Sequence, residues 1–442
     1  MDLRRVAVWV VVVALAPSGA RAGLSLDEAL ARHHALLEAA NEPVRTLSSS
    51  TPALSAPDAI TLGVSGPRER TPPLLRPGVD GSGAQLLYGA VDPDGIGWRL
   101  GVGWSNTVNV DGKRFNGGFN LDGSELSTKF GVGRAYASVQ RRHWGPSWVG
   151  SLILDAGAAP LPSIGWRSSD PTRFANPWFE WMGPWSADVF VGTLAGHSQP
   201  ERPRLWGGRF QFMPLDGLEV GLSRVIEWGG RGREENFRTL WRAMVGQDNV
   251  DGGIYNPSNQ LGGFDVRYTH RLGERGAVSV YAQAIGEDEA GGLPSMYLGS
   301  TGADFAFEAS GASWRVFAER ANTVAGGFAG HDRPGVAYQH SVYLQGYTQQ
   351  DRPLGFPAGG DLTLTSLGLL VERGPYAGML VLHHGRSHPG AQLSAPGRVR
   401  GLDGELAWKL AAADRIGATL THWRDPDSTR SRLQLWWQHL LR

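Results

Sequence analysis

A glycine-rich stretch near the middle of the chain brings an aromatic side chain close to two arginines. Trp228, Arg231 and Arg233 follow one another here, with Gly229, Gly230 and Gly232 between them. An indole ring offers a flat face to a sugar ring, and guanidinium groups offer forked donors to hydroxyls or uronate carboxylates. These residues therefore suit polysaccharide binding. The residue types alone favour an alternative, in which Trp228 belongs to a membrane-interface belt and the arginines are solvated.

An acidic run forms a second candidate site. Glu287, Asp288 and Glu289 precede Gly291 and Gly292, and three carboxylates could coordinate Ca²⁺, which takes oxygen ligands. The favoured alternative is an exposed or lumen-facing loop whose carboxylates pair with arginine. We therefore predict neither a metal site nor a cofactor.

Amide side chains form a third candidate. Asn256, Asn259 and Gln260 carry donors and acceptors that suit sugar hydroxyls. The same Asn-Pro-Ser sequence is also ordinary turn chemistry. The three candidate sites together make up our predicted polysaccharide-binding residues.

The sequence gives little support to catalysis. It contains no cysteine, no nucleophile-elbow serine and no HExxH motif. His33 and His34 diverge by about 100° on a helix and cannot easily share a metal, while His383 and His384 face opposite sides of a strand. Carboxylate pairs for glycoside cleavage depend on three-dimensional distances, so a hydrolase stays open as a minor alternative. We predict that the protein is not an enzyme and has no catalytic residues.

Alternation of large apolar residues with small or polar ones dominates the chain. Between Gly95 and Trp104 the apolar residues are Ile96, Trp98, Leu100 and Val102, with glycine or Arg99 between them. A period of two indicates a β-strand, and about ten residues suffice for a tilted strand to cross a bilayer. From residue 85 onward we count between 16 and 20 such runs, with no helical pattern of any length between them. Short and long connections alternate roughly, as in outer-membrane barrels.

The N-terminal part has a different organisation. Residues 1–22 have a basic start, an apolar run and a small-residue cleavage site, the features of a secretory signal peptide. A helix is predicted over Ser25–Ala40, and residues 41–83 read as a Pro/Ser-rich linker or irregular segment. We therefore divide the chain into a signal peptide (1–22), an N-terminal helix and Pro/Ser-rich periplasmic segment (23–84) and an outer-membrane β-barrel (85–442).

Composition supports this division. The 42 basic and 42 acidic residues balance, so nothing indicates nucleic-acid binding. The 17 tryptophans suit membrane interfaces. A propeller would show repeats of roughly 40 to 50 residues with a blade signature, which the sequence lacks. An all-β, closed transmembrane barrel is the best interpretation of the pattern.

Five stretches resemble the capsule-assembly Wzi family of Gram-negative outer-membrane proteins. They occur in the same order and at similar separations, so the resemblance covers most of the chain from about Leu121 onward. The stretches are HWGPSWVGSLIL (143–154), LWGGRFQF (205–212), LSRVIEWGGRGR (222–233), NPSNQLGGFD (256–265) and GEDEAGGLPS (286–295).

The resemblance implies a closed antiparallel barrel of about 18 strands with a short periplasmic helical segment. It also implies a lectin-like protein, located in the outer membrane, that attaches capsular or exopolysaccharide to the cell surface and supports capsule assembly. We expect a monomer in contact with outer-membrane lipid. The sequence departs from the family in its short N-terminal helical part and in ending Leu440-Leu441-Arg442 rather than on an aromatic residue.

The rival to this role is a passive porin with an open polar lumen. The two differ in whether the barrel is closed. We expect the long loops, with Trp228 and residues 286–295, to help block it. Loop lengths suggest that the connections 227–260 and 287–295 are extracellular, but the strand count is ambiguous at 336–360.

Overall fold

The computed structural model describes most of the chain. It covers residues 26–38, 58–66, 83–92, 94–110, 113–247, 258–273, 276–287, 289–290, 293–294, 296–326, 332–392 and 394–441. The predicted signal peptide and Asn256, one of the predicted polysaccharide-binding residues, lie outside these residues.

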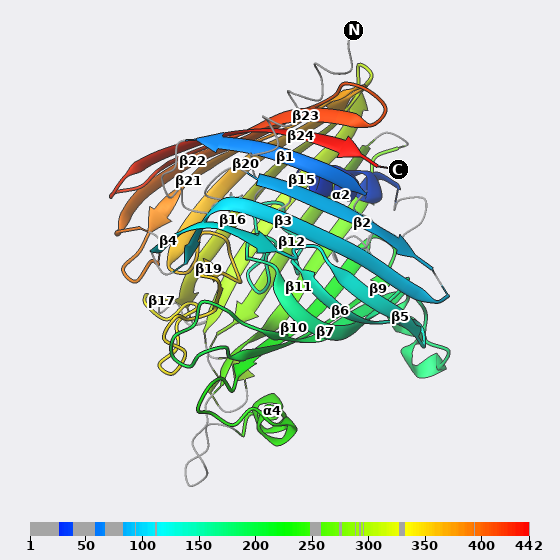
Figure 1. Cartoon of the computed structure of the whole chain (residues 1–442). Coiled ribbons are helices and arrows are strands. Elements are labelled where there is room, and N and C mark those ends of the chain that lie inside the picture. The colour runs from blue at the N-terminus through cyan, green and yellow to red at the C-terminus, as the bar shows by residue number, and fades with distance from the viewer. Residues whose placement is uncertain are drawn as a thin grey trace.

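The described strands form one closed antiparallel barrel (Figure 1). Eighteen strands make up its wall, and the sheet closes because β1 pairs with β24 on one side and with β2 on the other. The predicted fold class is confirmed. The wall strands are β1 (Ala59–Gly66), β2 (Gly83–Val91), β3 (Ile96–Val110), β5 (Glu125–Phe130), β6 (Gly133–Gln140), β7 (Leu161–Ser168), β8 (Trp185–Thr193), β9 (Arg204–Leu215), β10 (Leu218–Trp228), β11 (Asn259–Arg271), β12 (Gly276–Gly286), β15 (Tyr297–Ala309), β16 (Ala312–Gly326), β20 (Leu362–Arg373), β21 (Tyr376–Ser387), β22 (Gly397–Lys409), β23 (Asp414–Arg424) and β24 (Thr429–Leu440).

Short elements accompany the wall. The described helices are α2 (Leu26–Glu38), α4 (Phe237–Met244) and the 3₁₀ helix η1 (Pro177–Met182). The remaining strands are β4 (Lys113–Asn120), β13 (Glu289–Ala290), β14 (Leu293–Pro294), β17 (Asp332–Arg333), β18 (Thr348–Gln349) and β19 (Arg352–Pro353).

The period-two pattern sorts side chains between the two faces of the wall as predicted. Ile96 and Trp98 on β3 are 63% and 41% exposed on the outer face. Arg267 and Arg315 point inward and are buried, and both pair with Asp304 of β15. An exposed apolar outer face and a buried charged interior are the reverse of a soluble sandwich. This arrangement is typical of transmembrane β-barrels.

Strand β1 corrects the sequence interpretation of residues 41–83. Ala59–Gly66 lies within the stretch read as a linker, yet it pairs over its length with β24 and closes the barrel. Its sequence AITLGVSG does alternate, with Ile60, Leu62 and Val64 at every second position, but the run is only eight residues long and lies in a Pro/Ser-rich stretch, so the sequence interpretation missed it. The barrel therefore begins before residue 85.

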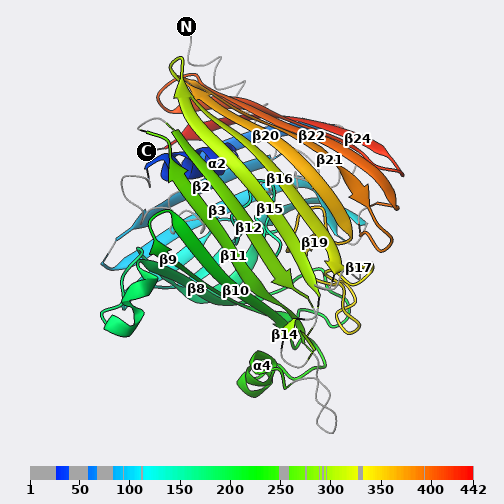
Figure 2. The ribbon, with the colours of Figure 1, turned by 180° about the vertical axis from the view of Figure 1, so that it is seen from behind.

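The connections fall into two groups at opposite ends of the barrel. Tight turns such as 131–132, 216–217 and 374–375 share one end with α2 and the C-terminus. The opposite end carries the longer connections and α4 (Figure 2). We call these the turn end and the loop end. No helix among the described residues is long and apolar enough to cross a membrane.

An aromatic cluster marks the outer wall at the turn end. Phe174 stacks on Trp185 with ring centroids 4.9 Å apart, and Phe210 and Phe212 of β9 lie beside them. Trp181 of η1 meets Phe212 edge-on. Aromatic girdles of this kind lie at the membrane–water interfaces of barrels.

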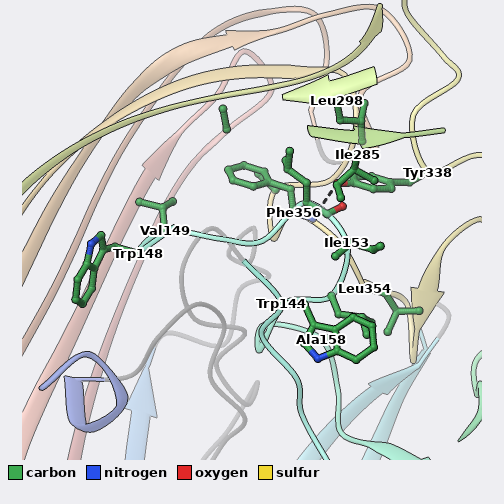
Figure 3. Close-up of a cluster of buried hydrophobic side chains, with 14 of the residues drawn as sticks. Trp144, Trp148, Val149, Ile153, Ala158, Ile285, Leu298, Tyr338, Leu354 and Phe356 are labelled. Carbon is green, nitrogen blue, oxygen red and sulfur yellow. Dashed lines mark hydrogen bonds between the residues drawn. The ribbon is translucent and has the colours of Figure 1, made fainter. Parts of the chain in front are cut away.

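Two connections from the loop end fold back into the barrel and fill it (Figure 3). The first, residues 141–160 between β6 and β7, we call the plug loop. The second, residues 332–361 between β16 and β20, we call the inner loop. Trp144 and Ile153 of the plug loop and Phe356 of the inner loop are buried in the same hydrophobic cluster. The region 336–360, in which the number of strands was ambiguous from the sequence, is therefore a folded loop with one short strand pair, β18–β19, and not part of the wall.

Wall side chains hold the backbone of the plug loop. The Glu319 carboxylate accepts hydrogen bonds from Trp148 N (2.5 Å) and Val149 N (3.0 Å). Gln283 donates to Trp144 O (2.7 Å) and accepts from Leu152 N (2.8 Å). The inward polar residues thus satisfy backbone groups that would otherwise be buried without partners.

Helix α2 seats the plug loop from the turn end. Arg32 donates to Ser147 O (2.8 Å) and Pro146 O (2.6 Å), and its guanidinium lies over the Trp148 ring. His33 is buried while His34 is exposed, as their divergence on a helix predicts. The described α2 agrees with the predicted helix to within its ends.

Candidate functional site

Three connections meet at the loop end and form a single surface, which we call the junction. They are the β8–β9 connection (194–203), the start of the β10–β11 connection (229–236) and residues 340–349 of the inner loop. Gln345 of the inner loop accepts hydrogen bonds from Ser198 N (3.2 Å) and Gln199 N (3.3 Å). Leu344 N donates to Gln199 O (3.1 Å). The junction is therefore a structured surface and not three independent loops.

Glycine allows the predicted motif to enter the junction. Gly229 and Gly230 have φ angles of 68° and 96°, which side chains rarely adopt. A Cβ at Gly230 would lie 2.9 Å from Pro200 Cβ and 3.1 Å from Glu201 O. The glycines therefore permit both the turn after β10 and its close approach to the β8–β9 connection.

Arg231 and Arg233 lie together on the junction. The Arg231 backbone N–H donates to Glu201 O (2.8 Å), and its guanidinium, with a side chain 76% exposed, pairs with the Glu201 carboxylate at 2.8 Å. The Arg233 guanidinium lies 5.6 Å from the centroid of the Tyr343 ring. Exposed Arg202 belongs to the same connection as Glu201. The junction thus offers forked cationic donors to an anionic or hydroxyl-rich ligand.

A buried polar cluster supports the junction from below. Glu227 accepts from Asn259 Nδ2 (3.0 Å), and its other oxygen lies 3.6 Å from His197 Nδ1. The other ring nitrogen of His197 lies 2.9 Å from Thr348 O of the inner loop. The predicted ligand residue Asn259 is thus buried, and it joins the first residues of β11 to the end of β10.

Trp228 and Gln260 lie away from the junction. Trp228 is buried on the outer wall, where Leu240 and Ala243 of α4 belong to the same apolar cluster. Gln260 Nε2 donates to Ala243 O (3.1 Å), and its carbonyl accepts from Arg224. The hypothesis that Trp228 helps to block the lumen is wrong, because the alternation along β10 places it outside. The alternative of an interface residue describes Trp228 better.

The acidic run lies at another connection of the loop end. Glu287 is buried and accepts from Tyr338 N of the inner loop (2.6 Å). This carboxylate faces the lumen, which agrees with one part of the favoured alternative; the pairing of these carboxylates with arginine stays a prediction. Asp288 lies outside the described residues, and of Glu289 only the backbone is described. No group of three or more potential ligand residues within the described ranges could hold a metal ion.

The structure therefore brings only part of the predicted site together. Arg231 and Arg233 share the junction, whereas Trp228, Asn259, Gln260 and Glu287 contact other parts of the fold. Sequence reasoning missed Glu201, Tyr343 and Gln345, which lie far from the glycine-rich stretch in sequence and carry no motif of their own.

The fold by itself defines a class of protein. A closed, internally filled barrel with an apolar outer belt is an outer-membrane β-barrel.

Residues 94–371 match the family model described as capsule assembly protein Wzi, and the chain belongs to this family. This is a family of capsule assembly proteins and not a class of enzyme, in agreement with the sequence interpretation.

Two relatives extend the comparison. A Klebsiella pneumoniae protein described as an uncharacterized 55.8 kDa protein in the cps region is 33% identical over 220 residues, which span 49% of this chain and 44% of the relative. The matched part is thus less than half of that protein. A solved structure, described as Wzi, a carbohydrate-binding outer-membrane β-barrel involved in group 1 capsule assembly in Escherichia coli, is 21% identical with a TM-score of 0.76. That match covers 96% of this chain and 99% of the other and shows a shared fold.

Proposed function

We propose that the chain is a monomeric outer-membrane barrel that holds capsular or exopolysaccharide at the cell surface and supports capsule assembly. Membership of the capsule assembly family is the observation that carries the proposal. A single chain closes its own wall through the β1–β24 pairing, which supports a monomer. The apolar outer wall supports direct contact with lipid.

The loop end faces the outside of the cell in this proposal. Outer-membrane barrels have short periplasmic turns and longer extracellular loops. The tight turns, α2 and the C-terminus would then lie in the periplasm, with residues 1–22 removed as a signal peptide. The part of the N-terminal segment that precedes β1 would be periplasmic. Strand β1 belongs to the wall, and its antiparallel pairing with β24 and β2 places the end of β1 and the start of β2 at the loop end.

The junction is the proposed polysaccharide contact. Arg231 and Arg233 would donate forked hydrogen bonds to hydroxyls or to uronate carboxylates. The Glu201 carboxylate would orient Arg231 and accept from sugar hydroxyls. The ring centroids of His340 and Tyr343 lie 5.4 Å apart beneath this surface. Their packing would stabilise the conformation of the inner loop at the junction. Asn256, Asp288 and Glu289 stay candidate contacts, since the structure does not describe their side chains.

The rival porin function receives less support. The plug loop and the inner loop fill the barrel among the described residues, and wall side chains bind their backbone. A polar lumen serves a porin only when it is open. Here the inward polar residues have become partners of the plug loop.

Gene deletion and complementation in a capsulated strain test the proposal. We expect deletion to release polymer into the medium with total synthesis unchanged, and the wild-type gene to restore cell-bound polymer. The double variant Arg231→Gln/Arg233→Gln should restore markedly less, because it keeps side-chain length but loses the cationic forks. Cell-bound and released polymer are measured separately.

Arg333→Gln is the matched control. Arg333 is also an exposed arginine at the loop end, but it lies on β17, outside the junction. It should complement as well as the wild type. Unchanged cell-bound polymer in the deletion strain would refute attachment, and shortened polymer after incubation with purified protein would indicate a hydrolase.

A further inference from the structure

Helix α4 lies at the loop end of the barrel (Figure 1). There it packs against outward-facing side chains of β10. Leu240 and Ala243 pack against Ile226 and Trp228 of β10, and Trp206 of β9 lies in the same cluster. Alternation along these strands places the wall residues on the outer face, the face that meets lipid lower down the wall. The helix is thus joined to the lipid-facing surface and not to the lumen.

The helix is held in this position at both ends. Asn236 Oδ1 accepts from Thr239 N (3.0 Å) as the N-terminal cap. Arg224, on the outer face of β10, donates to Met244 O (2.8 Å) and Ala243 O (3.3 Å) and so satisfies carbonyls of the last turn. A short helix that is marginal alone is therefore fixed to the wall.

The side of α4 that faces away from the barrel has an aromatic half and a basic half, which follow from its sequence FRTLWRAM. Successive residues are turned by about 100° around a helix, so Phe237 and Trp241 share one edge while Arg238 and Arg242 share the next. The two rings are 76% and 55% exposed and stack with centroids 6.5 Å apart. The guanidinium groups of Arg238 and Arg242 have no hydrogen bond or ion pair with any side chain or backbone group that the structure describes.

The aromatic edge continues the apolar outer wall. Leu222 of β10 and Phe264 of β11 pair across the two strands and are exposed on the outer face. Strands β10 and β11 are the two that the connection carrying α4 joins. Aromatic rings next to cationic side chains on an amphipathic helix suit the boundary between acyl chains and anionic head groups.

We propose that α4 is a membrane-surface anchor. Phe237 and Trp241 enter the acyl region beside the barrel, and Arg238 and Arg242 pair with anionic lipid phosphates. The partner is the bilayer surface itself, because the helix continues an established lipid-facing wall and its unpaired charges complement lipid phosphates. The anchor fixes the depth of the loop end in the membrane, and it does not depend on polysaccharide binding at the junction.

Single-site labelling can test this cleanly, since the chain has no cysteine. Phe237→Cys and, as control, Ser341→Cys at an exposed position of the inner loop are each labelled with a small environment-sensitive fluorophore. The full-length protein is reconstituted into phosphatidylcholine vesicles, with or without phosphatidylglycerol, containing lipids brominated close to the head group. We expect brominated lipid to quench the label at 237 severalfold more than the label at 341, and aqueous iodide to do the reverse.

The role of Arg238 and Arg242 is tested by comparing vesicles with and without phosphatidylglycerol. Phosphatidylglycerol should increase quenching at 237, and Arg238→Gln/Arg242→Gln should abolish that increase while leaving the sheet content unchanged. Equal access of iodide to positions 237 and 341 would overturn the anchor. Protection of position 237 by soluble capsular polysaccharide but not by lipid would overturn it in favour of a glycan surface. A phosphatidylglycerol effect that survives the double variant would overturn the role of the arginines.

Discussion

Glu319 shows what a wall carboxylate does in this barrel. Its oxygens accept from Trp148 N and Val149 N, and the Tyr281 hydroxyl donates to it as well (2.7 Å). A carboxylate with two acceptor oxygens suits two neighbouring amides, which the rigid backbone of the plug loop presents together. The residue therefore fixes the plug loop to the wall at one point.

Replacing this carboxylate by an amide should loosen the plug loop. Glu319→Gln keeps the volume but turns one acceptor into a donor, which leaves one buried amide without a partner, at a cost on the order of 1–3 kcal/mol. We expect faster hydrogen exchange at Trp148 and Val149. Glu308→Gln, an exposed carboxylate on neighbouring β15, should leave these rates unchanged. Equal hydrogen-exchange rates in wild type and Glu319→Gln would show that the hydrogen bonds from Trp148 N and Val149 N to Glu319 do not hold the plug loop.

His33 makes the docking of α2 depend on pH. Burial, and then the nearby Arg315 charge, lower the pKa of His33 from 6.5 to about 3. Its Nδ1 accepts from Arg315 Nε (3.0 Å), so Nε2 carries the proton and donates to Ser313 Oγ (2.6 Å). The docked state needs the neutral ring. Because the folded pKa is depressed, the stabilisation is complete above pH 6.5 and is lost as the pH falls toward 3.

We therefore expect α2 to undock more easily in acid. Between pH 7 and pH 5 the docking free energy should fall by about 2 kcal/mol, since a free histidine titrates near 6.5. Hydrogen exchange of the α2 amides against pH measures the effect, after correction for the intrinsic rate. His33→Gln cannot titrate and should remove this slope, and an unchanged slope in that variant would contradict the assignment.

At the residue scale the sequence identified the motif but not the contacts. Arg231 and Arg233 could be predicted as candidate ligand residues because each follows a glycine in a long loop, where we expect its side chain to be accessible to solvent. The alternation along β10 already placed Trp228 on the same face as Ile226. The sequence did not predict that α4 would cover that face. Glu201 and Tyr343 join the same surface only because β8, β10 and the inner loop meet in space.

At the scale of elements, the plug loop and the inner loop behave as one interlocked unit. Tyr338 OH donates to Leu152 O (2.7 Å) and accepts from Phe356 N (3.1 Å), while Tyr347 OH donates to Ile153 O (2.8 Å). Burial raises the pKa of both tyrosines well above 10, so both phenols stay protonated and can donate. The two loops thus depend on each other for satisfied carbonyls.

The two hydroxyls form a matched pair for mutation. Tyr338→Phe leaves two buried backbone groups without a partner, whereas Tyr347→Phe leaves one, and each such group costs roughly 1–3 kcal/mol. We expect limited proteolysis to cut the plug loop fastest in Tyr338→Phe, more slowly in Tyr347→Phe and slowest in the wild type. The reverse order of the two variants would show that these bonds do not hold the loops together.

Elements with strong alternation were predictable, and those without it were not. Strands such as β3, β10 and β11 expose apolar residues on the outer face and point polar ones inward, so the period of two is clear in their sequences. Strand β1 alternates through Ile60, Leu62 and Val64, but it is only eight residues long and lies in a Pro/Ser-rich stretch, so its signal was missed. Helix α4 is also only eight residues long, too short for a clear helical period. The plug loop resembled a family motif, but nothing in its local pattern predicted that it would enter the barrel.

At the scale of the whole molecule, the polar interior of the barrel binds the plug loop and does not line an open channel. We call this interior the socket. Asp304, Arg267 and Arg315 form a buried ion-paired group that also binds the plug loop, because Arg267 donates to Pro146 O (2.6 Å) and Trp148 Nε1 donates to Asp304 (3.0 Å). Charges in such a place are costly unless paired and hydrogen-bonded. Removing the plug loop would return them to water, which an eighteen-stranded barrel has room to admit.

This leads to a prediction about conductance that separates a socket from a pore. In planar bilayers we expect the wild-type protein to show no steady open-channel current, because the plug loop and the inner loop occupy the lumen. A variant with residues 145–153 replaced by a short Gly/Ser linker should fold, since the β6–β7 pairing does not involve these residues, and should conduct steadily. Shortening the 169–184 connection at the turn end to a tight turn is the control, because Trp181 of this segment packs against the outer wall, and the barrel should stay closed. Steady current through the wild type would favour the passive porin. A closed deletion variant would instead mean that the inner loop and α2 seal the barrel without the plug loop.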